Sequence, residues 1–119
     1  MLWHQLTENS QLQNIIDISH QQPDSNRAVV IFKHSTRCSI SSMALSRFES
    51  KWKDDPTVQA FFLDLLQHRD LSNEIARRFD VEHASPQVLL IKNGRCFYHA
   101  SHNGIIVSDI LEAIATQTQ

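Results

Sequence analysis

Cysteine is the residue type in this chain best suited to covalent chemistry, and the 119 residues contain two, Cys38 and Cys96, far apart in sequence. Cys38 stands between polar residues, with Ser35–Arg37 before it and Ser39 after it. A free cysteine is commonly buried and acts as a small hydrophobic residue. The polar flanks argue against burial, so the sequence predicts that Cys38 is an accessible, reactive thiol.

The expected position of Cys38 favours the same interpretation. The continuous apolar run Ala28–Phe32 predicts a buried strand, and a helical pattern begins at Cys38. The first turn of a helix presents unpaired N–H groups and partial positive charge, which stabilise a thiolate. Lys33, His34 and Arg37 add possible cations within five residues of the thiol. Sites of α/β proteins lie at the carboxyl ends of such strands.

Ser41 occupies the place where a C-x-x-C motif would carry its second cysteine. A cysteine with serine in that place can open a mixed disulfide but cannot close a local intramolecular one. The Ser41 hydroxyl can donate a hydrogen bond to a thiolate three residues earlier. Alternatively, Ser41 is simply a good residue for the first turn of a helix.

Cys96 follows the dipeptide Asn93-Gly94, a strong signal for a tight hairpin turn. The strand that begins after Pro86 would run antiparallel to the strand before Cys38. Its five or six residues would carry Cys96 about 15–20 Å from Cys38, beyond the ~6 Å Cα separation of a disulfide. We therefore expect Cys96 to be structural.

Hydrophobic periodicity predicts the elements that must position Cys38. Helical repeats and strand-like runs alternate, and a hairpin and a last helix, capped by Ser108, follow. The helices are expected at 8–20, 38–53, 71–79 and 108–116, the loop at 21–26, and the strands at 28–32, 60–65, 87–92 and 95–99, with a weak extra strand at Leu2-Trp3. This order predicts an α/β protein, a three-layer α/β/α sandwich with a mixed sheet of about four strands, as in the thioredoxin fold.

Composition restricts the class of protein. Residues 1–119 suit a single domain, and 41% hydrophobic with 20% charged residues is typical of a folded globule. The formal net charge of −2 makes nucleic acid an unexpected partner. The sequence shows neither a secretory leader nor an apolar run of about 20 residues that could span a membrane. We expect a cytoplasmic protein, with both thiols reduced.

Four blocks of the sequence resemble the YtxJ family of monothiol bacilliredoxins, which have a thioredoxin-like fold. These are KHSTRCSIS at 33–41, RDLSNEIA at 69–76, HASPQVLLIKNG at 83–94 and HASH at 99–102, in the family's order. One departure is Ser39, where the family commonly has proline. A proline there would rigidify the first turn and remove one N–H group.

The resemblance implies a thiol-disulfide oxidoreductase that removes bacillithiol from S-bacillithiolated proteins. Cys38 would be the nucleophile, bacillithiol the cosubstrate, and no cofactor would be bound. Substrate contacts are implied at the residues around the thiol and at a cis-proline loop, namely Thr36, Arg37, Ser41, Ser85 and Pro86. Arg37 would meet the anionic malyl part of bacillithiol, whereas Lys33 and His34 either do the same or are solvated loop charges.

Other interpretations of the chain stay open. A non-catalytic thioredoxin-like module could bind a protein partner through the same surface, and a redox sensor would only be capped at Cys38. Cys96, His99 and His102 suggest a metal site, but alternation along a strand would place Cys96 and His99 on opposite faces. Asp64 is either a buried proton-handling carboxylate or an exposed strand-end residue. His83 and His102 have no assigned role.

Overall fold

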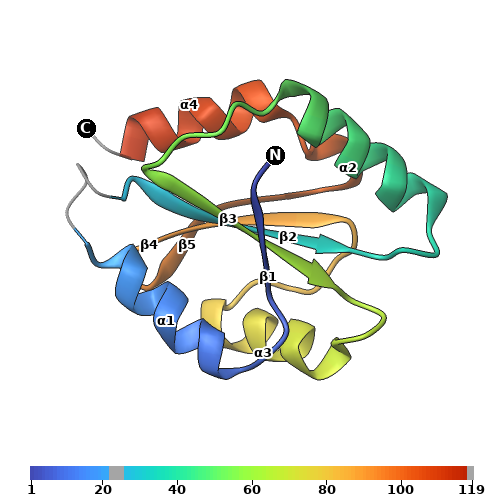
Figure 1. The fold of residues 1–119 in the computed structure, drawn as a ribbon, viewed down its shortest axis with the longest axis horizontal. Coiled ribbons are helices and arrows are strands. Elements are labelled where there is room, and N and C mark those ends of the chain that lie inside the picture. The colour runs from blue at the N-terminus through green and yellow to red at the C-terminus, as the bar shows by residue number, and fades with distance from the viewer. Residues whose placement is uncertain (22–25, 118–119) are drawn as a thin grey trace.

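The computed structural model describes residues 1–21 and 26–117, which form five strands, four α-helices and one short 3-10 helix (Figure 1). Residues 22–25 of the predicted loop at 21–26 lie outside the described residues. In chain order the elements are β1 (Trp3–Gln5), α1 (Ser10–Ser19), β2 (Ala28–His34), α2 (Ser39–Lys51), β3 (Val58–Asp64), α3 (Arg69–Phe79), β4 (Gln87–Lys92), β5 (Arg95–Ser101), η1 (His102–Gly104) and α4 (Val107–Gln117).

The sheet is mixed and has the strand order β1-β3-β2-β4-β5. Strands β1, β3 and β2 are parallel, whereas β4 runs antiparallel to β2 and to β5. The sheet has five strands, one more than the expected number of about four. The weak strand expected at Leu2-Trp3 forms at Trp3–Gln5, because it pairs with Ala60–Phe62 of β3.

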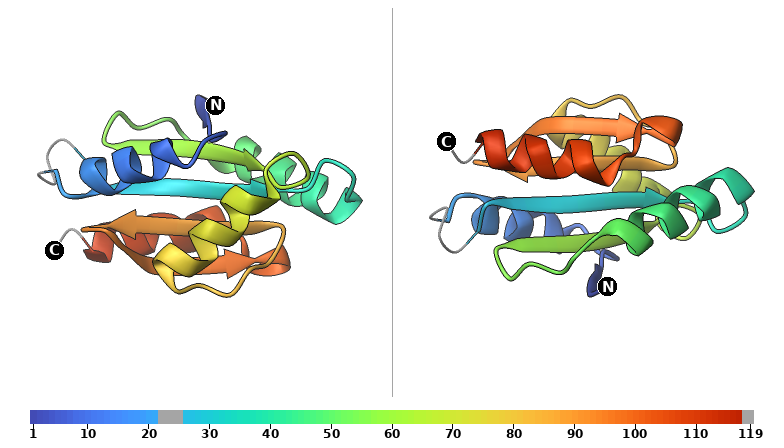
Figure 2. Two further views of the ribbon diagram at one scale, coloured as in Figure 1. Left: turned by 90° about the horizontal axis from the view of Figure 1, so that it is seen from below. Right: turned by 90° about the horizontal axis from the view of Figure 1, so that it is seen from above.

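Helices cover both faces of the sheet, so the expected three-layer α/β/α arrangement is confirmed. Helices α2 and α4 pack on one face and α1 and α3 on the other (Figures 1 and 2). Each face has its own apolar core. Val30 and Phe32 of β2 point to the α2/α4 side, and Val29 and Ile31 to the α1/α3 side. Burial on both faces explains why β2 is a continuous apolar run without alternation.

Strand β2 is longer than the apolar run predicted, because Lys33 and His34 are also part of it. Both are buried. The interpretation of Lys33 and His34 as loop charges is therefore wrong. Two polar residues after an apolar run resemble a loop in the sequence, but here each side chain finds partners in a different layer of the sandwich.

The helices also differ from expectation in detail. In α2, Ala44, Phe48 and Trp52 face the core, but Ile40 is 55% exposed. Helix α4 begins at Val107, so Ser108 lies inside the helix and does not cap it. Ile110 and Ile114 are buried, whereas Leu111 is exposed.

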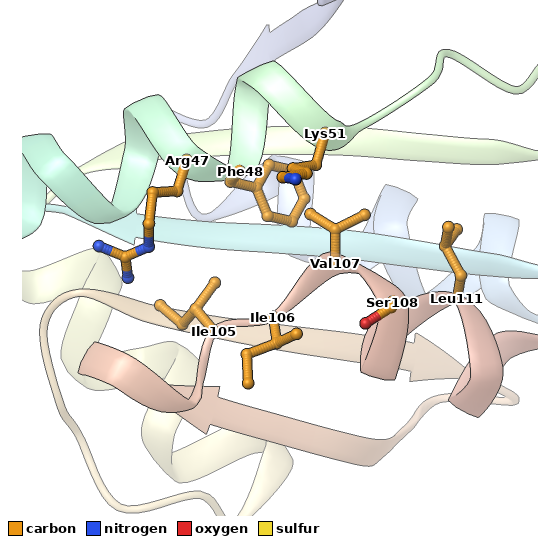
Figure 3. Close-up of a pocket in the computed structure, with 8 residues that line it drawn as sticks. All are labelled: Arg47, Phe48, Lys51, Ile105, Ile106, Val107, Ser108 and Leu111. Atoms are coloured by element: carbon orange, nitrogen blue, oxygen red, sulfur yellow. The ribbon is translucent and has the colours of Figure 1, made fainter.

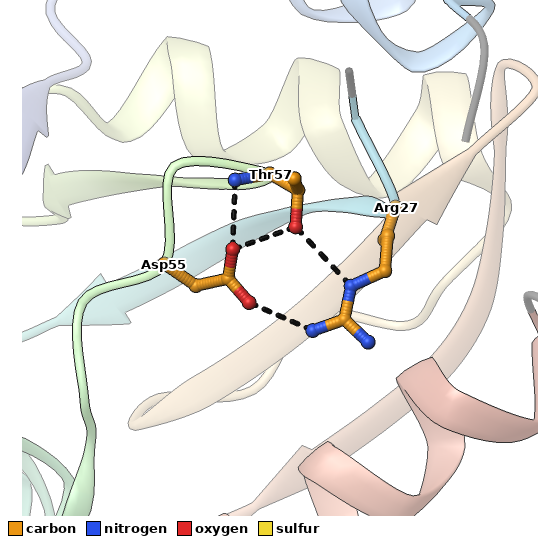
Figure 4. Close-up of polar contacts among 3 residues, drawn as sticks. All are labelled: Arg27, Asp55 and Thr57. Atoms are coloured by element: carbon orange, nitrogen blue, oxygen red, sulfur yellow. Dashed lines mark hydrogen bonds and ion pairs between the residues drawn. The ribbon is translucent and has the colours of Figure 1, made fainter. Parts of the chain in front are cut away.

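A polar network ties the starts of β2 and β3 together (Figure 4). The guanidinium of Arg27 donates to Asp55 Oδ2 (2.7 Å) and to Thr57 Oγ1 (3.2 Å). The backbone N–H and hydroxyl of Thr57 donate to Asp55 Oδ1 at 2.8 and 2.6 Å, and these bonds, with Arg27, hold the pKa of Asp55 below its usual range. The network lies at the end of the sheet opposite to Cys38, and it helps to set the register of the two parallel strands.

Lys33 is fully buried on the α3 side of the sheet. Its Nζ donates to the carbonyl of Ser72 (3.2 Å) and lies 3.4 Å from Nδ1 of His83. Burial lowers the pKa of Lys33 from 10.5 to about 8. His83, which had no assigned role, thus lies beside a buried amine that is costly to charge, and burial and this amine lower the pKa of His83.

The pKa of Lys33 predicts how stability changes at alkaline pH. Between pH 8 and 10.5 the unfolded chain keeps a proton that folded Lys33 has lost, so the free energy of unfolding should rise with pH. At 1.36 kcal/mol for each pKa unit, the gain is about 3 kcal/mol. Urea unfolding across this range should show a larger rise in the wild type than in Lys33→Met, since Lys92, whose pKa burial also lowers, is present in both. Parallel curves would contradict the assignment.

Candidate active site

Cys38 is the N-cap residue of α2, as the sequence predicted. Its backbone is extended (φ −105°, ψ 119°), its N–H donates to the carbonyl of Ser35 (3.1 Å), and its own carbonyl accepts from the N–H of Ser42 (3.0 Å). The residue is half-buried, and its neighbours Arg37 and Ser39 are exposed. The thiol therefore lies at the N-terminus of α2 with access to solvent.

Ser41 is fully buried and connects the first turn of α2 to the end of β2. Its Oγ accepts a hydrogen bond from the N–H of Ser35 (3.0 Å) and lies 2.8 Å from Nδ1 of His34. The serine at the second-cysteine position is thus more than a favourable first-turn residue. Its hydroxyl holds the turn that carries Cys38, a role that the sequence pattern did not indicate.

The direction in which the Ser41 hydroxyl donates its proton depends on the tautomer of the His34 imidazole. Burial lowers the pKa of His34, although the carboxylates of Asp64 and Glu49 oppose this, so the ring is neutral at pH 7. A neutral ring either accepts the Ser41 proton at Nδ1 or donates Nδ1–H to Oγ. In the second arrangement the hydroxyl proton is free, but no hydrogen bond joins Ser41 to Cys38 among the described residues.

The Ser85–Pro86 peptide bond is cis, as the family resemblance implied. Gln87, the first residue of β4, pairs with Lys33 near the end of β2. The Ser85–Pro86 segment therefore lies at the end of the sheet where β2 finishes and the turn to Cys38 begins. The Ser85 hydroxyl oxygen is buried and has no hydrogen-bond partner within residues 1–21 and 26–117. The carbonyl of Pro86 accepts from the N–H of His102 (3.1 Å), which gives His102 a structural role at the start of η1.

Thr36 and Arg37 line a small pocket with the connection between β3 and α3. Asp64, the last residue of β3, is half-buried, and its Oδ1 accepts from the N–H of Leu66 (3.0 Å), so Asp64 is neither fully buried nor a free surface residue. Arg69, the first residue of α3, also lines this pocket. Arg69 has no visible role in the sequence, because only the fold places it in one pocket with Arg37.

Cys96 lies at the other end of the sheet. It pairs with Ile91, whereas the end of β4 near Cys38 is Gln87, which pairs with Ser101. Both cysteines are free thiols, and the thiol of Cys96 donates to the carbonyl of Tyr98 (3.2 Å). Burial raises the pKa of Cys96. Cys96 thus has the features of a structural thiol.

Contrary to the expectation from strand alternation, Cys96 and His99 do not lie on opposite faces of the sheet. A bulge in β5 pairs Leu90 with Tyr98 but Ile91 with Cys96, so Phe97 has no partner. His99 pairs with Leu89, which shares a core with Ile91, so Cys96 and His99 lie on the same face of the sheet. Even so, the described residues contain no group of three or more side chains that could hold a metal ion.

A larger and more apolar pocket lies between α2 and the start of α4 (Figure 3). It has a volume of about 450 Å³, and Arg47 and Lys51 of α2 face Ile106 and Leu111 across it. None of the residues expected to contact substrate lines this pocket. The end of the sheet at Cys38, rather than this apolar pocket, therefore carries the candidate site.

The chain matches the family model "Monothiol bacilliredoxin BrxC" over residues 4–110. It belongs to the monothiol bacilliredoxin family. A solved structure of a proposed oxidoreductase with a thioredoxin fold is similar to this bacilliredoxin, with 30% identity, a TM-score of 0.71 and coverage of 92% of this chain and 90% of that one. Family membership supports a thiol redox function.

Solved thioredoxins share the fold of this bacilliredoxin at lower identity. The thioredoxin of Malassezia sympodialis is 19% identical with a TM-score of 0.69, and the match covers 99% of this chain and 92% of that one. The thioredoxin of Fasciola hepatica is also 19% identical with a TM-score of 0.69, with 96% and 98% covered. These matches confirm the expected thioredoxin-like fold. No helix within the described ranges is long and apolar enough to cross a membrane.

The structure predicts that this bacilliredoxin tolerates the family's usual proline at position 39. Ser39 is the first residue of α2, and Cys38 has the extended conformation that a residue before proline requires. Ser39→Pro should stabilise the protein by about 0.4–1 kcal/mol, by restricting the unfolded chain. Ser42→Pro, which removes the hydrogen bond to Cys38, should instead cost about 3 kcal/mol. Urea unfolding checks both, and destabilisation by Ser39→Pro would contradict the expected geometry.

Removing the Ser41 hydroxyl should destabilise the turn that carries Cys38. Ser41→Ala leaves the Ser35 N–H and the His34 ring without their partner, at a cost of about 1–3 kcal/mol. Ser42→Ala, an exposed serine in the same helical turn, should stay within about 0.5 kcal/mol of the wild type. Thermal unfolding compares the stabilities of the two variants. Equal stabilities would exclude the role of Ser41 in holding the turn that carries Cys38.

Proposed function

We propose that this protein removes bacillithiol from S-bacillithiolated proteins by thiol-disulfide exchange at Cys38. The Cys38 thiolate attacks the bacillithiol sulfur of the mixed disulfide, a new S–S bond forms to Cys38, and the target protein leaves as a thiolate that takes up a proton. A second bacillithiol thiolate then attacks the bacillithiol sulfur on Cys38. This releases bacillithiol disulfide and restores the Cys38 thiolate, so electrons and atoms balance.

The observation that carries the proposal is the position of Cys38 as the N-cap residue of α2, with Ser41 in place of a second cysteine. Within the described residues the other thiol, Cys96, lies at the far end of the sheet. A disulfide formed at Cys38 therefore has no nearby thiol in the chain to resolve it. An external thiol must do so, as expected for the family that the chain belongs to.

The surroundings of Cys38 supply what sulfur exchange requires. The N–H groups of the first turn of α2 stabilise the attacking and departing thiolate at Cys38. Ser41 and His34 hold the turn that presents this thiol. Ser85 and Pro86 would present backbone groups to an extended segment of the target protein. This chemistry fits a cytoplasmic location, where thiols are kept reduced.

Substitution of each cysteine tests the proposal. Cys38→Ser should reduce release of bacillithiol from a bacillithiolated protein to the uncatalysed rate, because a hydroxyl does not replace a thiolate in sulfur exchange. Cys96→Ser is the matched control and should keep full turnover, because its half-buried thiol lies at the far end of the sheet. The assay follows the release of bacillithiol over many turnovers by mass spectrometry.

Two outcomes of this assay would contradict the proposal. Turnover by Cys38→Ser would exclude Cys38 as the nucleophile. Capture of a single bacillithiol by the wild type without turnover would instead indicate a redox sensor. Glutathione used in place of bacillithiol, at equal concentration, tests the cosubstrate and should support slower turnover.

A further inference from the structure

The pocket beside the Cys38 turn combines two segments that are distant in sequence. Thr36 and Arg37 come from the turn after β2, and Arg69 comes from the first turn of α3. The remaining lining residues, Asp64, Leu66 and Gln67, belong to the end of β3 and the connection that follows. Figure 1 shows both connections at the same edge of the sheet. The pocket has a volume of about 360 Å³, which suits a small molecule rather than a protein segment.

The two arginines of this pocket differ from Arg27 and Arg77, although the exposed Arg47, Arg78 and Arg95 are also unpaired within the described residues. Arg27 pairs with Asp55, and Arg77 pairs with Glu74. Within residues 1–21 and 26–117, the guanidinium groups of Arg37 and Arg69 have no ion pair and no hydrogen bond. A guanidinium presents a planar fork of N–H donors that matches a carboxylate. Two such groups in one pocket therefore favour a ligand with carboxylates.

Asp64 narrows the chemistry of that ligand. It is the one carboxylate among the described residues of the lining, and the N–H of Leu66 occupies its Oδ1. A ligand with negative charge alone would be repelled by Asp64. The pocket thus favours a compound whose carboxylates are accompanied by amino or hydroxyl donors.

We infer that this pocket binds the carboxylate-bearing part of the small thiol that exchanges at Cys38, with Arg37 and Arg69 as its specificity-determining residues. The inference rests on the proposed function and deepens it. Arg37 is the residue directly before the thiol, so a ligand held there by its carboxylates keeps its sulfur near Cys38. Neutral thiols would lack this contact and would rely on diffusion alone.

Kinetics with two thiols test the inference. With bacillithiol as the reducing thiol, Arg69→Gln should raise KM about tenfold, which corresponds to about 1.4 kcal/mol of binding free energy, and leave kcat nearly unchanged. With 2-mercaptoethanol, which has no carboxylate, the same variant should match the wild type. Arg78→Gln, an exposed arginine of the same helix outside the pocket, is the matched control and should behave as the wild type with both thiols.

Two kinetic results would overturn the inference. An equal loss with both thiols would mean that Arg69 supports the fold or the chemistry and not recognition of carboxylate. A rise in KM for bacillithiol in Arg47→Gln but not in Arg69→Gln would place the ligand in the apolar pocket between α2 and α4 instead.

A binding measurement separates this inference from the proposed function. L-malate, a dicarboxylate without a thiol, should shift the arginine Nε–H NMR signals of Arg37 and Arg69 in the wild type, and these shifts should be lost in Arg69→Gln. If malate binds in this way but the wild type shows no turnover with bacillithiol, the proposed function fails while the pocket assignment stands. If turnover is normal but malate leaves both signals unchanged, the pocket assignment fails alone.

Discussion

The register of β2 within the sheet is the constraint on which the rest of the structure depends. Its residues pair in parallel with Val58–Asp64 of β3 and antiparallel with β4, where Lys33 meets Gln87. Because of these directions, the ends of β2 and β3 and the start of β4 meet at one edge. The turn to Cys38, the connection to α3 and the cis-proline loop therefore converge. A slip of one residue would exchange the two buried faces of β2 and lose both cores.

The same alternation explains the two polar residues at the end of β2. Lys33 continues the face of Val29 and Ile31, so its amine reaches Ser72 and His83 on the α3 side. His34 continues the face of Val30 and Phe32, so its ring reaches Ser41 in α2. Two consecutive side chains thereby anchor the strand to both helical layers just before the reactive turn. Charging the buried amine of Lys33 lowers the stability of the fold, and the surrounding polar atoms offset this cost only in part.

The candidate site combines one accessible thiol with groups that different elements bring to the same end of the sheet. Helix α2 contributes Cys38 and Ser41, β2 contributes His34, and the β4 side contributes Ser85 and Pro86. The pocket of Arg37 and Arg69 lies on the β3 side of the same edge. Since Cys96 is held at the opposite end, the architecture favours exchange with a thiol from outside the chain. This agrees with membership of a monothiol family.

The sequence by itself determined the order of elements, the place of Cys38 at a helix start and the family, because these depend on local periodicity and on contiguous motifs. It failed where partners are distant along the chain. Lys33 and His34 look like loop charges until the sheet and helices bury them, and Arg69 has no visible link to Arg37. The bulge at Phe97 reverses which side chains share a face, an effect that simple alternation does not show. Tertiary structure decided these points, because burial, register and convergence depend on contacts between residues far apart in sequence.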